Sequence, residues 1–350
     1  MKAAVLYKNE DIRYVDVETP KPKKGEVLVK VHECGICGSD VPRVLANGAH
    51  YYPIILGHEF SGEVVELGEG VTKVKVGDRV SGVPLVPCMN CPDCNNGNYS
   101  LCKNYTFIGS RIQGAYAEYV AMPEANVVKF DKNVSYECGA FFEPSTVALH
   151  GIFVSNFKKD TNVAILGGGT IGLLTMQWVN ILGCKSVTVY DINDERLELA
   201  KELGATYTIN TITSDPVEET KKLFPRGFDF VFETCGSVPT EKLSFKVAGN
   251  KSTICLIGTP TKDITFTPRE FEDINRKEFI LTGSWMSYSK PFPGKEWEMT
   301  SEYFSKGLLK IDGSFIYKRY PLKNAYDAFQ EFKNPKNVKG KILLVIDENN

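Results

Sequence analysis

Apolar and polar residues alternate in short segments through the first 150 residues of the chain. Residues 26–31 (Glu-Val-Leu-Val-Lys-Val) and residues 62–67 (Gly-Glu-Val-Val-Glu-Leu) are typical, and glycine and proline separate such segments. Alternation with a period of two places the apolar side chains on one face of a strand, so it predicts half-buried β-strands. We therefore expect a β-rich domain over residues 1–150.

The pattern changes after about residue 160. An apolar run at residues 163–166 is followed by a helical pattern to about Leu182, and a second run at 186–190 is followed by a helical pattern to about Leu203. Further strands are expected at residues 228–233, 253–257 and 279–282. Strands that alternate with helices predict a parallel, doubly wound sheet.

The last part of the chain has a weaker pattern. Beyond residue 290 we expect loop, a helix near residues 324–332 and a final strand at 341–346. The fold class predicted for the whole chain is α/β. A domain typically has about 150 residues, so a length of 350 residues agrees with two domains.

Composition narrows the range of partners. The chain has 43% hydrophobic and 24% charged residues and a net charge of −2, without long runs of one sign, which favours neither nucleic acid nor a membrane as partner. The N-terminal segment lacks the features of a signal peptide, and no apolar stretch approaches the roughly 20 residues of a membrane helix. We expect a cytoplasmic protein.

Four of the ten cysteines fall in one short segment. Cys88, Cys91, Cys94 and Cys102 lie among proline, asparagine, glycine and aspartate, which are typical of a loop without regular structure. Four thiolates can enclose a tetrahedral zinc ion and leave no position for a substrate, so the spacing predicts a structural zinc site. The alternative is four unrelated loop cysteines. Single cysteines in apolar surroundings are expected to be small buried hydrophobes; these are Cys138, Cys184, Cys235 and Cys255.

A glycine-rich turn follows the strand at 163–166. Gly167, Gly169 and Gly172 fit the pattern G-x-G-x-x-G at the opening of a helix, and Asp191 ends the next strand. The helix N-terminus faces the pyrophosphate of a dinucleotide, and an acidic residue binds the adenosine ribose hydroxyls and repels a 2′-phosphate. The cofactor predicted is NAD. The expected cofactor-binding residues are Gly167, Gly169, Thr170, Ile171, Gly172, Asp191 and Arg196.

A second zinc site is expected in the first domain. Cys37 and His58 are ligands that suit zinc, and two or three protein ligands leave a position for a substrate. Taken alone, His58 could equally be a buried core histidine rather than a metal ligand. Cys34 and Cys37 also form a C-x-x-C pair, but redox pairs of that kind belong at the opening of a helix in a βαβ unit, whereas this region is β-rich.

Residues 57–62 (Gly-His-Glu-Phe-Ser-Gly), continuing through Gly68 to residues 77–80, resemble the signature of the zinc-containing medium-chain alcohol dehydrogenase family. The four-cysteine segment and the glycine-rich turn follow in the order found in that family. The resemblance implies a GroES-like catalytic domain over 1–150, a Rossmann domain over 151–290 and a segment over 291–350 that returns to the first domain. It also implies homodimers or homotetramers.

The resemblance assigns roles by position. It implies that Cys37 rather than Cys34 is the first ligand of a catalytic zinc, that His58 is the second, and that Glu59 is a ligand or lies close behind the metal. Glu143 matches an acidic position beside the metal in the polyol dehydrogenase branch, and Ser39 matches the hydroxyl that takes the alcohol proton. Pro42 stands where many relatives have a proton-relaying histidine. Two zinc ions per subunit are thus expected.

Segments 47–53, 107–111 and 283–288 resemble those of hexitol-phosphate dehydrogenases within this family. That resemblance implies oxidation of a polyol phosphate, galactitol 1-phosphate to tagatose 6-phosphate. Cationic side chains that could hold the phosphate are Arg43, Arg111, Lys290 and Lys295, although each could equally be a solvated surface residue.

Other functions remain open from the sequence. An unphosphorylated polyol such as sorbitol, or a pentitol phosphate, could be the substrate. A cofactor-binding protein without enzymatic activity could share the fold, since fold does not imply function. An open zinc site would serve no purpose there or in a zinc-free quinone reductase, so the candidate zinc ligands favour a dehydrogenase.

Overall fold

The computed structural model describes residues 1–311, 315–334 and 337–346. They divide into two compact units, Met1–Glu143 with Tyr288–Asn350, and Pro144–Ser287. The chain therefore passes from one unit to the other after residues 143 and 287, whereas the sequence predicted boundaries after residues 150 and 290. Within the described part of the chain, no helix is long and apolar enough to cross a membrane.

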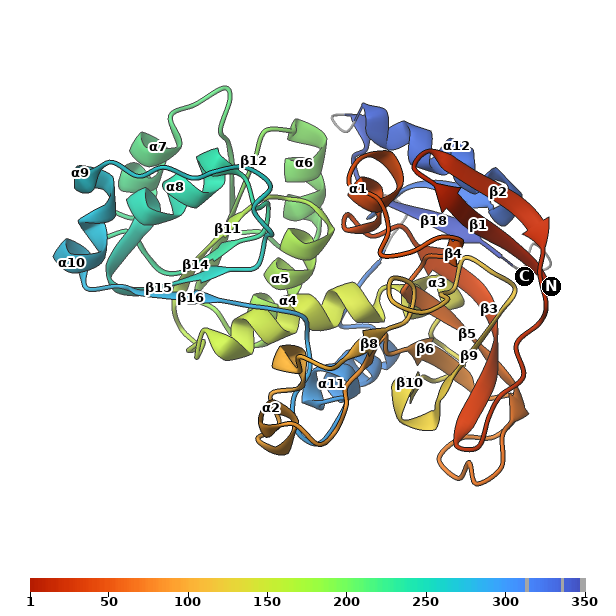
Figure 1. The fold of residues 1–350 in the computed structure, drawn as a ribbon. Coiled ribbons are helices and arrows are strands. Elements are labelled where there is room, and N and C mark those ends of the chain that lie inside the picture. Colours follow the sequence, from red (N-terminus) through yellow and green to blue (C-terminus); the bar gives the residue numbers. More distant parts are fainter. Residues whose placement is uncertain (312–314, 335–336, 347–350) are drawn as a thin grey trace. The chain divides into compact units, whose positions relative to one another are not determined.

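The first unit contains a seven-stranded sheet in the order β10-β6-β5-β3-β18-β17, with β9 paired to β3 (Figure 1). Its strands are β3 (Glu26–Gly35), β5 (Glu59–Leu67), β6 (Arg79–Gly82), β9 (Tyr119–Pro123), β10 (Val127–Lys129), β17 (Ile316–Pro321) and β18 (Lys341–Val345). The alternating residues Val27, Val29 and Val31 of β3 are completely buried. The period-two pattern therefore produces the apolar face that was expected of it.

Smaller elements complete this unit. Its short strands are β1 (Lys2–Lys8), β2 (Asp11–Asp16), β4 (Ile54–Ile55), β7 (Leu85–Val86) and β8 (Thr106–Phe107), and its first helices are α1 (Asp40–Leu45), α2 (Pro92–Asn95) and α3 (Tyr136–Ala140). Helix α4 (Phe142–Val154) begins in the first unit and continues into the second. Helix α12 (Ala325–Gln330) and the 3₁₀ turns beside it occupy the region where a helix was predicted near 324–332.

The C-terminal strand joins the middle of the large sheet. β18 pairs antiparallel to β3, with Leu344 opposite Cys34 and Leu343 opposite Gly35. A strand from the end of the chain thus runs beside the segment that leads to Cys37. The sequence predicted the strand itself but not its partner, because pairing depends on tertiary contacts.

Helix α11 (Lys295–Ser305) was not predicted, and the expectation of loop after residue 290 is wrong at this point. Trp297, Thr300 and Phe304 are buried, and their spacing is that of one face of a helix. Phe304 stacks on Phe142, with ring centroids 5.3 Å apart. The apolar face is narrow and lies among charged residues, which explains why the pattern was missed.

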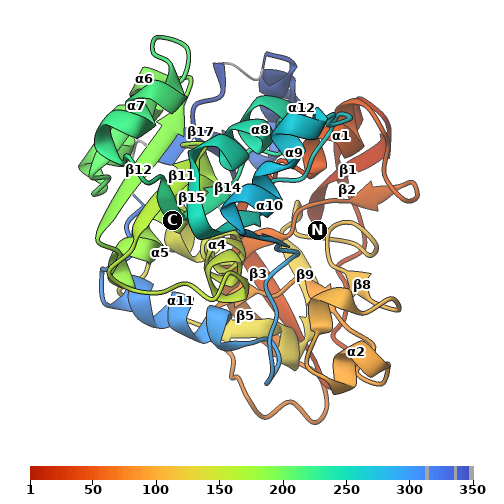
Figure 2. The ribbon, with the colours of Figure 1, turned by 90° about the vertical axis from the view of Figure 1, so that its left-hand side faces the viewer.

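The second unit contains a six-stranded parallel sheet in the order β13-β12-β11-β14-β15-β16. Figure 2 labels four of its strands, β11, β12, β14 and β15. Its strands are β11 (Asn162–Leu166), β12 (Ser186–Asp191), β13 (Tyr207–Asn210), β14 (Phe228–Glu233), β15 (Ala248–Leu256) and β16 (Ile280–Gly283). Its helices are α5 (Thr170–Ile181), α6 (Asp194–Glu202), α7 (Pro216–Leu223), α8 (Val238–Val247), α9 (Pro268–Phe271) and α10 (Asp273–Lys277). The predicted doubly wound sheet is present, and its order reverses between β11 and β14.

Candidate active site

Two neighbouring strand ends bring Cys37, His58 and Glu59 together. β3 ends at Gly35, β5 begins at Glu59, and these two residues are opposite each other in the antiparallel pair. Cys37 follows the first strand and His58 precedes the second, so one ligand atom of each of Cys37, His58 and Glu59 lies within 4.8 Å of the others. The structure therefore assembles the three residues that the sequence proposed for the catalytic zinc.

Cys34 lies outside this group of three. Its side chain is completely buried, and burial raises the pKa of its thiol well above the ordinary value. All ten cysteines are free, so the C-x-x-C pair forms no disulfide. The geometry agrees with the choice of Cys37 rather than Cys34 as the metal-facing residue.

Asp40 is a neighbour of the cluster that was not among the site residues predicted from the sequence. Its side chain is completely buried, and Oδ2 lies 3.6 Å from Nδ1 of His58 and accepts a hydrogen bond of 3.0 Å from the Tyr116 hydroxyl. At 3.6 Å the carboxylate lies behind the His58 ring without hydrogen-bonding to it. The Cys-Gly-Ser-Asp sequence could have revealed it, since Asp40 directly follows Ser39.

Lys341 is a second residue that sequence reasoning missed. Nζ lies 2.6 Å and 2.9 Å from the two carboxylate oxygens of Glu59, and the two side chains are only 8% and 3% exposed. Its position at the start of an apolar strand gave no sign of this contact. Only the pairing of β18 with β3 brings the lysine to the cluster.

Glu143 lies at the start of α4 and is buried. Burial raises the pKa of its carboxyl group to about 7, the nearby His58 opposes this, and the charge of Glu59 adds to it. Glu143 is therefore close enough to interact with the cluster, although it does not belong to the group within 4.8 Å. Its position agrees with an acidic residue beside a metal rather than with a surface carboxylate.

The donor set fits a zinc ion. Burial raises the pKa of the Cys37 thiol, and the charge of Glu59 raises it further. A divalent cation would offset both effects and stabilise the thiolate. One thiol, one imidazole and one or two carboxylates are ligands that zinc accepts, and this set is the composition of an open rather than a closed site.

Ser39 and Arg43 lie directly beside the cluster. The Ser39 hydroxyl donates to Sγ of Cys37 over 3.3 Å and accepts a hydrogen bond of 2.9 Å from Nη1 of Arg43. The same Nη1 also donates to the Ser39 carbonyl oxygen and to Oδ1 of Asp40. Helix α1 makes these contacts possible, because Ser39 and Arg43 are one helical turn apart. Pro42 lies in the same helix and has no proton to relay.

The other candidate phosphate ligands are placed differently. Arg111 is exposed, stacks over the Tyr105 ring at 4.6 Å, and belongs to a turn that begins at Phe107, whose ring contacts His58 edge-on at 5.4 Å. The side chain of Lys290 lies against Gly97 in the four-cysteine segment. Lys295 is the first residue of α11. Of these four candidates, Arg43 and Arg111 lie on segments that contact the neighbourhood of His58.

The four sulfur atoms of Cys88, Cys91, Cys94 and Cys102 lie within 4.8 Å of one another. The segment is not entirely irregular, as was expected, because α2 begins after Cys91, whose sulfur accepts a hydrogen bond of 3.5 Å from the Cys94 backbone. A backbone hydrogen bond from Asn90 lowers the pKa of Cys88 to about 7. Hydrogen bonds from N–H groups stabilise thiolates, so this cluster fits a closed structural zinc site.

The glycine-rich turn of the second unit has the geometry that a dinucleotide requires. Gly167 has a φ of +109°, which favours glycine, and a Cβ on Gly172 would lie 1.8 Å from the Gly167 carbonyl oxygen. Around Gly169, the N-cap of α5, a Cβ would meet no atom within 4 Å, so the backbone there is open to a ligand. Thr170 and Ile171 form the first turn of that helix.

Asp191 ends β12 beside this turn. Oδ2 accepts a hydrogen bond of 2.7 Å from the Gly168 N–H and lies 3.6 Å from Nη1 of Arg196.

Cys235 lies close to the glycine-rich turn, with Sγ next to Gly167. Cys235 is exposed, so the expectation that it is buried is wrong; it follows the carboxyl end of β14, where the chain leaves the sheet. Cys138 and Cys184 are partly buried, and Cys255 is buried as expected.

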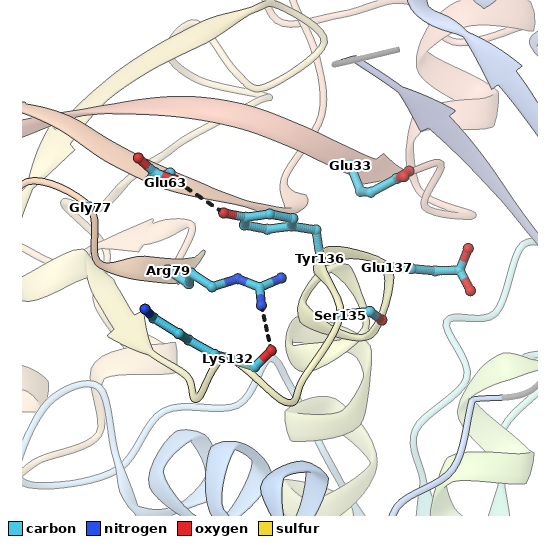
Figure 3. A pocket seen from close by; sticks show the side chains of 8 residues that line it. All are labelled: Glu33, Glu63, Gly77, Arg79, Lys132, Ser135, Tyr136 and Glu137. Carbon is cyan, nitrogen blue, oxygen red and sulfur yellow. Dashed lines mark hydrogen bonds between the residues drawn. The ribbon is translucent and has the colours of Figure 1, made fainter. Parts of the chain in front are cut away.

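A separate cavity of about 600 Å³ lies in the first unit (Figure 3). It is lined by Glu33, Glu63, Gly77, Arg79, Lys132, Ser135, Tyr136 and Glu137. The Arg79 guanidinium stacks on the Tyr136 ring at 3.9 Å and donates to the Lys132 carbonyl oxygen. None of the predicted site residues lines this cavity, so we do not assign the catalytic function to it.

Comparison with known proteins agrees with this geometry. Residues 23–132 match the alcohol dehydrogenase GroES-like domain, and residues 170–302 match the zinc-binding dehydrogenase family. Galactitol 1-phosphate 5-dehydrogenase of Escherichia coli K-12 is 40% identical over 347 residues, covering 99% of this chain and 100% of the relative. The chain belongs to the zinc-binding alcohol dehydrogenase family.

Solved structures show the same relationship. The crystal structure of galactitol-1-phosphate dehydrogenase from Escherichia coli superposes with a TM-score of 0.94 and covers 99% of this chain and 100% of that one. A protein described as a zinc-binding dehydrogenase, from Sinorhizobium meliloti 1021 and solved with NADP bound, is 32% identical, with a TM-score of 0.89 and 99% coverage of both chains. This dehydrogenase therefore has the medium-chain fold, with a GroES-like domain and a Rossmann-type parallel sheet.

Proposed function

We propose that this dehydrogenase oxidises a secondary hydroxyl of a polyol phosphate with NAD, converting galactitol 1-phosphate to tagatose 6-phosphate. The observation that carries the proposal is the hydrogen bond of 2.9 Å between Nη1 of Arg43 and Oγ of Ser39. It places a permanent positive charge beside the hydroxyl that would take the alcohol proton. A phosphate on the same substrate needs such a charge within reach.

Cys37, His58 and Glu59, with Glu143 beside them, would hold the catalytic zinc, and the four-cysteine segment would hold a second zinc ion. When bound, zinc polarises the alcohol oxygen and lowers the pKa of the hydroxyl, and NAD supplies the hydride acceptor. Ser39 would accept the proton that the alcohol loses; its hydroxyl hydrogen-bonds Cys37, one of the proposed zinc ligands. The Asp40 carboxylate, 3.6 Å from Nδ1 of His58, would help to orient that ring when the metal is bound.

The proton must then leave Ser39 by a route that differs from that of many relatives. Pro42 has no titratable group, and Arg43 is already fully protonated, so neither can accept the proton. Ser39 itself is exposed. We therefore propose that the serine hydroxyl passes its proton directly to water. One alcohol and one NAD⁺ give one ketone, one NADH and one proton.

We propose NAD rather than NADP because of Asp191. Its carboxylate lies beside the glycine-rich turn, where the ribose hydroxyls of the adenosine would bind, and its charge would repel a 2′-phosphate. Gly167, Gly169 and Gly172, with Thr170 and Ile171 in the first helical turn, would hold the pyrophosphate. Arg196 is 3.6 Å from Asp191 and would contact the adenosine part of the cofactor.

We also propose a cytoplasmic homodimer or homotetramer that assembles through the second unit. β16 is an edge strand of the parallel sheet, and Ile280 and Leu281 on it are 62% and 41% exposed. Exposed apolar edge strands are sites where a second chain can pair. Sedimentation velocity measures the oligomeric state directly.

The test of the proposed function is steady-state NAD reduction with a panel of substrates. Galactitol 1-phosphate should give a higher kcat/KM than galactitol or sorbitol, because the phosphate adds binding energy remote from the reacting carbon. A preference for an unphosphorylated polyol would replace this proposal with a sorbitol-type activity.

A further inference from the structure

Tyr116 is a buried residue of the first unit, and its backbone is tied to the segment that leads to His58. The Tyr116 N–H donates to the Leu56 carbonyl oxygen over 2.9 Å, and the Ala115 N–H donates to the Gly57 carbonyl oxygen over 2.9 Å. The aromatic ring lies directly against Gly57, where a Cβ would come within 2.5 Å of Cδ1 of Tyr116. The ring therefore packs on the residue that precedes His58.

The hydroxyl at the other end of the ring reaches the segment that carries Cys37. It donates to Oδ2 of Asp40 over 3.0 Å and lies 3.4 Å from the Gly35 carbonyl oxygen. Gly35 ends β3, two residues before Cys37. The Asp40 N–H in turn donates to the Cys37 carbonyl oxygen over 3.0 Å. One side chain thus connects the two segments that supply Cys37 and His58.

The Asp40 carboxylate is held at both of its oxygens. Oδ1 accepts a hydrogen bond of 3.0 Å from Nη1 of Arg43, and Oδ2 accepts the hydrogen bond from Tyr116. The side chain of Asp40 is completely buried, so an oxygen that lost its donor could not turn to water instead. The Tyr116 hydroxyl therefore determines where Oδ2 lies.

The position of Oδ2 matters because it faces His58. Oδ2 lies 3.6 Å from Nδ1 of His58, and in the described part of the chain this nitrogen is buried without a hydrogen-bond partner. A histidine that binds a metal through one ring nitrogen usually donates the N–H of the other to a carboxylate or a carbonyl group. An approach of about 0.5 Å would bring Oδ2 and Nδ1 into hydrogen-bond range.

We propose that Tyr116 is a positioning residue for the catalytic zinc, because its hydroxyl holds the Asp40 carboxylate where Nδ1 of His58 can donate to it. This inference rests on the proposed zinc site, since it concerns the retention of the same ion. The role belongs to the hydroxyl, whereas the ring packs on Gly57. Loss of the hydroxyl alone should therefore weaken zinc binding although every ligand is kept.

The test is zinc retention by the holoenzyme, equilibrated with increasing concentrations of EDTA and measured by elemental analysis after desalting. The catalytic zinc is the ion that Cys37→Ala lacks. Tyr116→Phe removes only the hydroxyl, and it should lose the catalytic zinc at an EDTA concentration about tenfold lower, since partners behind a metal-binding histidine change metal affinity by that factor or more. The zinc of the four-cysteine segment should be retained as in the unmodified enzyme.

Tyr190→Phe is the matched control. Tyr190 is also buried, and its hydroxyl lies 2.6 Å from Oγ1 of Thr220 in the second unit. This variant loses a comparable buried hydrogen bond, so its thermal stability should fall by a similar amount. It should nevertheless retain both zinc ions as the unmodified enzyme does. Thermal unfolding of each variant measures the loss of stability.

A double-mutant cycle with Asp40→Asn tests whether Tyr116 acts through Asp40. Asp40→Asn should itself weaken retention of the catalytic zinc, because a neutral amide is a poorer hydrogen-bond partner for His58 than a carboxylate. If the hydroxyl acts through the carboxylate, Tyr116→Phe should cause a smaller fold-change in the Asp40→Asn background than in the unmodified enzyme.

The outcomes separate this inference from the proposed function. If folded Tyr116→Phe retains the catalytic zinc as the unmodified enzyme does, or weakens its retention by the same factor in both backgrounds, the inference is wrong and the proposed zinc site stands. Equal weakening in Tyr190→Phe would also overturn it, because any buried hydroxyl would then have the same effect. If the unmodified enzyme binds no more zinc than Cys37→Ala, the proposed zinc site itself fails.

Discussion

The ammonium group of Lys341 lies 2.6 Å from one carboxylate oxygen of Glu59, and the two residues are separated by almost the whole chain. Both side chains are buried at the cluster formed with Cys37 and His58. The pair gives Glu59 a counter-ion that does not depend on a metal. Lys341 therefore fixes the position of the Glu59 carboxylate beside Cys37 and His58.

Replacing Lys341 by methionine should destabilise the protein by about 3 to 5 kcal/mol, because it leaves the Glu59 carboxylate buried without its partner. Urea unfolding measures the loss. The matched control is Lys318→Met, which removes an exposed pair with Glu331 and should cost less than about 1 kcal/mol. Equal effects in both variants would show that the buried pair has no special importance.

Two zinc ions with different roles should be bound. Cys37→Ala should lose one zinc ion and all turnover while the fold is kept, and Cys91→Ala should lose the other zinc ion and unfold at a lower temperature. Elemental analysis and calorimetry measure the two effects. A chelator should abolish activity before it unfolds the protein. Comparable loss of stability in both variants would contradict this division of roles.

Cofactor choice should depend on the charge of Asp191. Asp191→Asn keeps an oxygen that can accept the hydrogen bond from Gly168 but removes the charge, so NADP should bind better and the preference for NAD should narrow. Asp191→Ser should narrow it too, with a larger loss of NAD binding, because the shorter side chain no longer reaches that N–H. The measurement is kcat/KM for each cofactor. Equal use of NAD and NADP by the unmodified enzyme would refute the role.

Arg43 and Arg111 should give different mutational signatures. Arg43 contacts Ser39, so Arg43→Ala should reduce kcat/KM for both galactitol 1-phosphate and galactitol. Arg111→Ala should reduce it for the phosphate ester alone, by about tenfold or more. Lys290→Ala is the matched control, because that side chain lies against Gly97 in the four-cysteine segment. An equal effect of Arg111→Ala on both substrates would assign Arg111 a structural role.

Glu33 should make stability depend on pH. Burial raises the pKa of this carboxyl to about 8, and the charge of Glu137 adds to the rise (Figure 3). Below about pH 4.5 the carboxyl is protonated in both states, and the protein keeps its full stability. As the pH rises through about 8, the buried carboxyl must ionise, and the folded state loses stability relative to the unfolded state. Glutamine does not ionise, so Glu33→Gln avoids this loss of stability. At pH 9 the variant should be more stable than the unmodified protein by about 2 kcal/mol, a value lowered to allow for screening of the charge by solvent.

Chemical unfolding at pH 4.5 and pH 9 checks this expectation. The two proteins should differ little at the lower pH. Glu69→Gln changes a side chain that is 81% exposed and should have little effect at either pH. A constant difference between Glu33→Gln and the unmodified protein would contradict the titration of Glu33.

Local patterns in the sequence determined most of the fold and many of the candidate residues. The period-two segments around β3 and β5 and the strand–turn–helix at Gly167 act over a few neighbouring residues, so they can be read without a structure. The spacing of Cys88, Cys91, Cys94 and Cys102 is equally local. The same reasoning missed α11, whose apolar face of Trp297 and Phe304 lies among charged residues.

The tertiary structure alone decided which distant residues meet. Lys341 reaches Glu59 because β18 pairs with β3, and strand pairing joins segments at any distance along the chain. Cys235 is exposed because it follows the carboxyl end of β14, where the chain leaves the parallel sheet. Periodicity determines the secondary structure of a segment from its neighbours in the sequence. The burial of a side chain and its ion pairs depend on distant residues that only folding brings close.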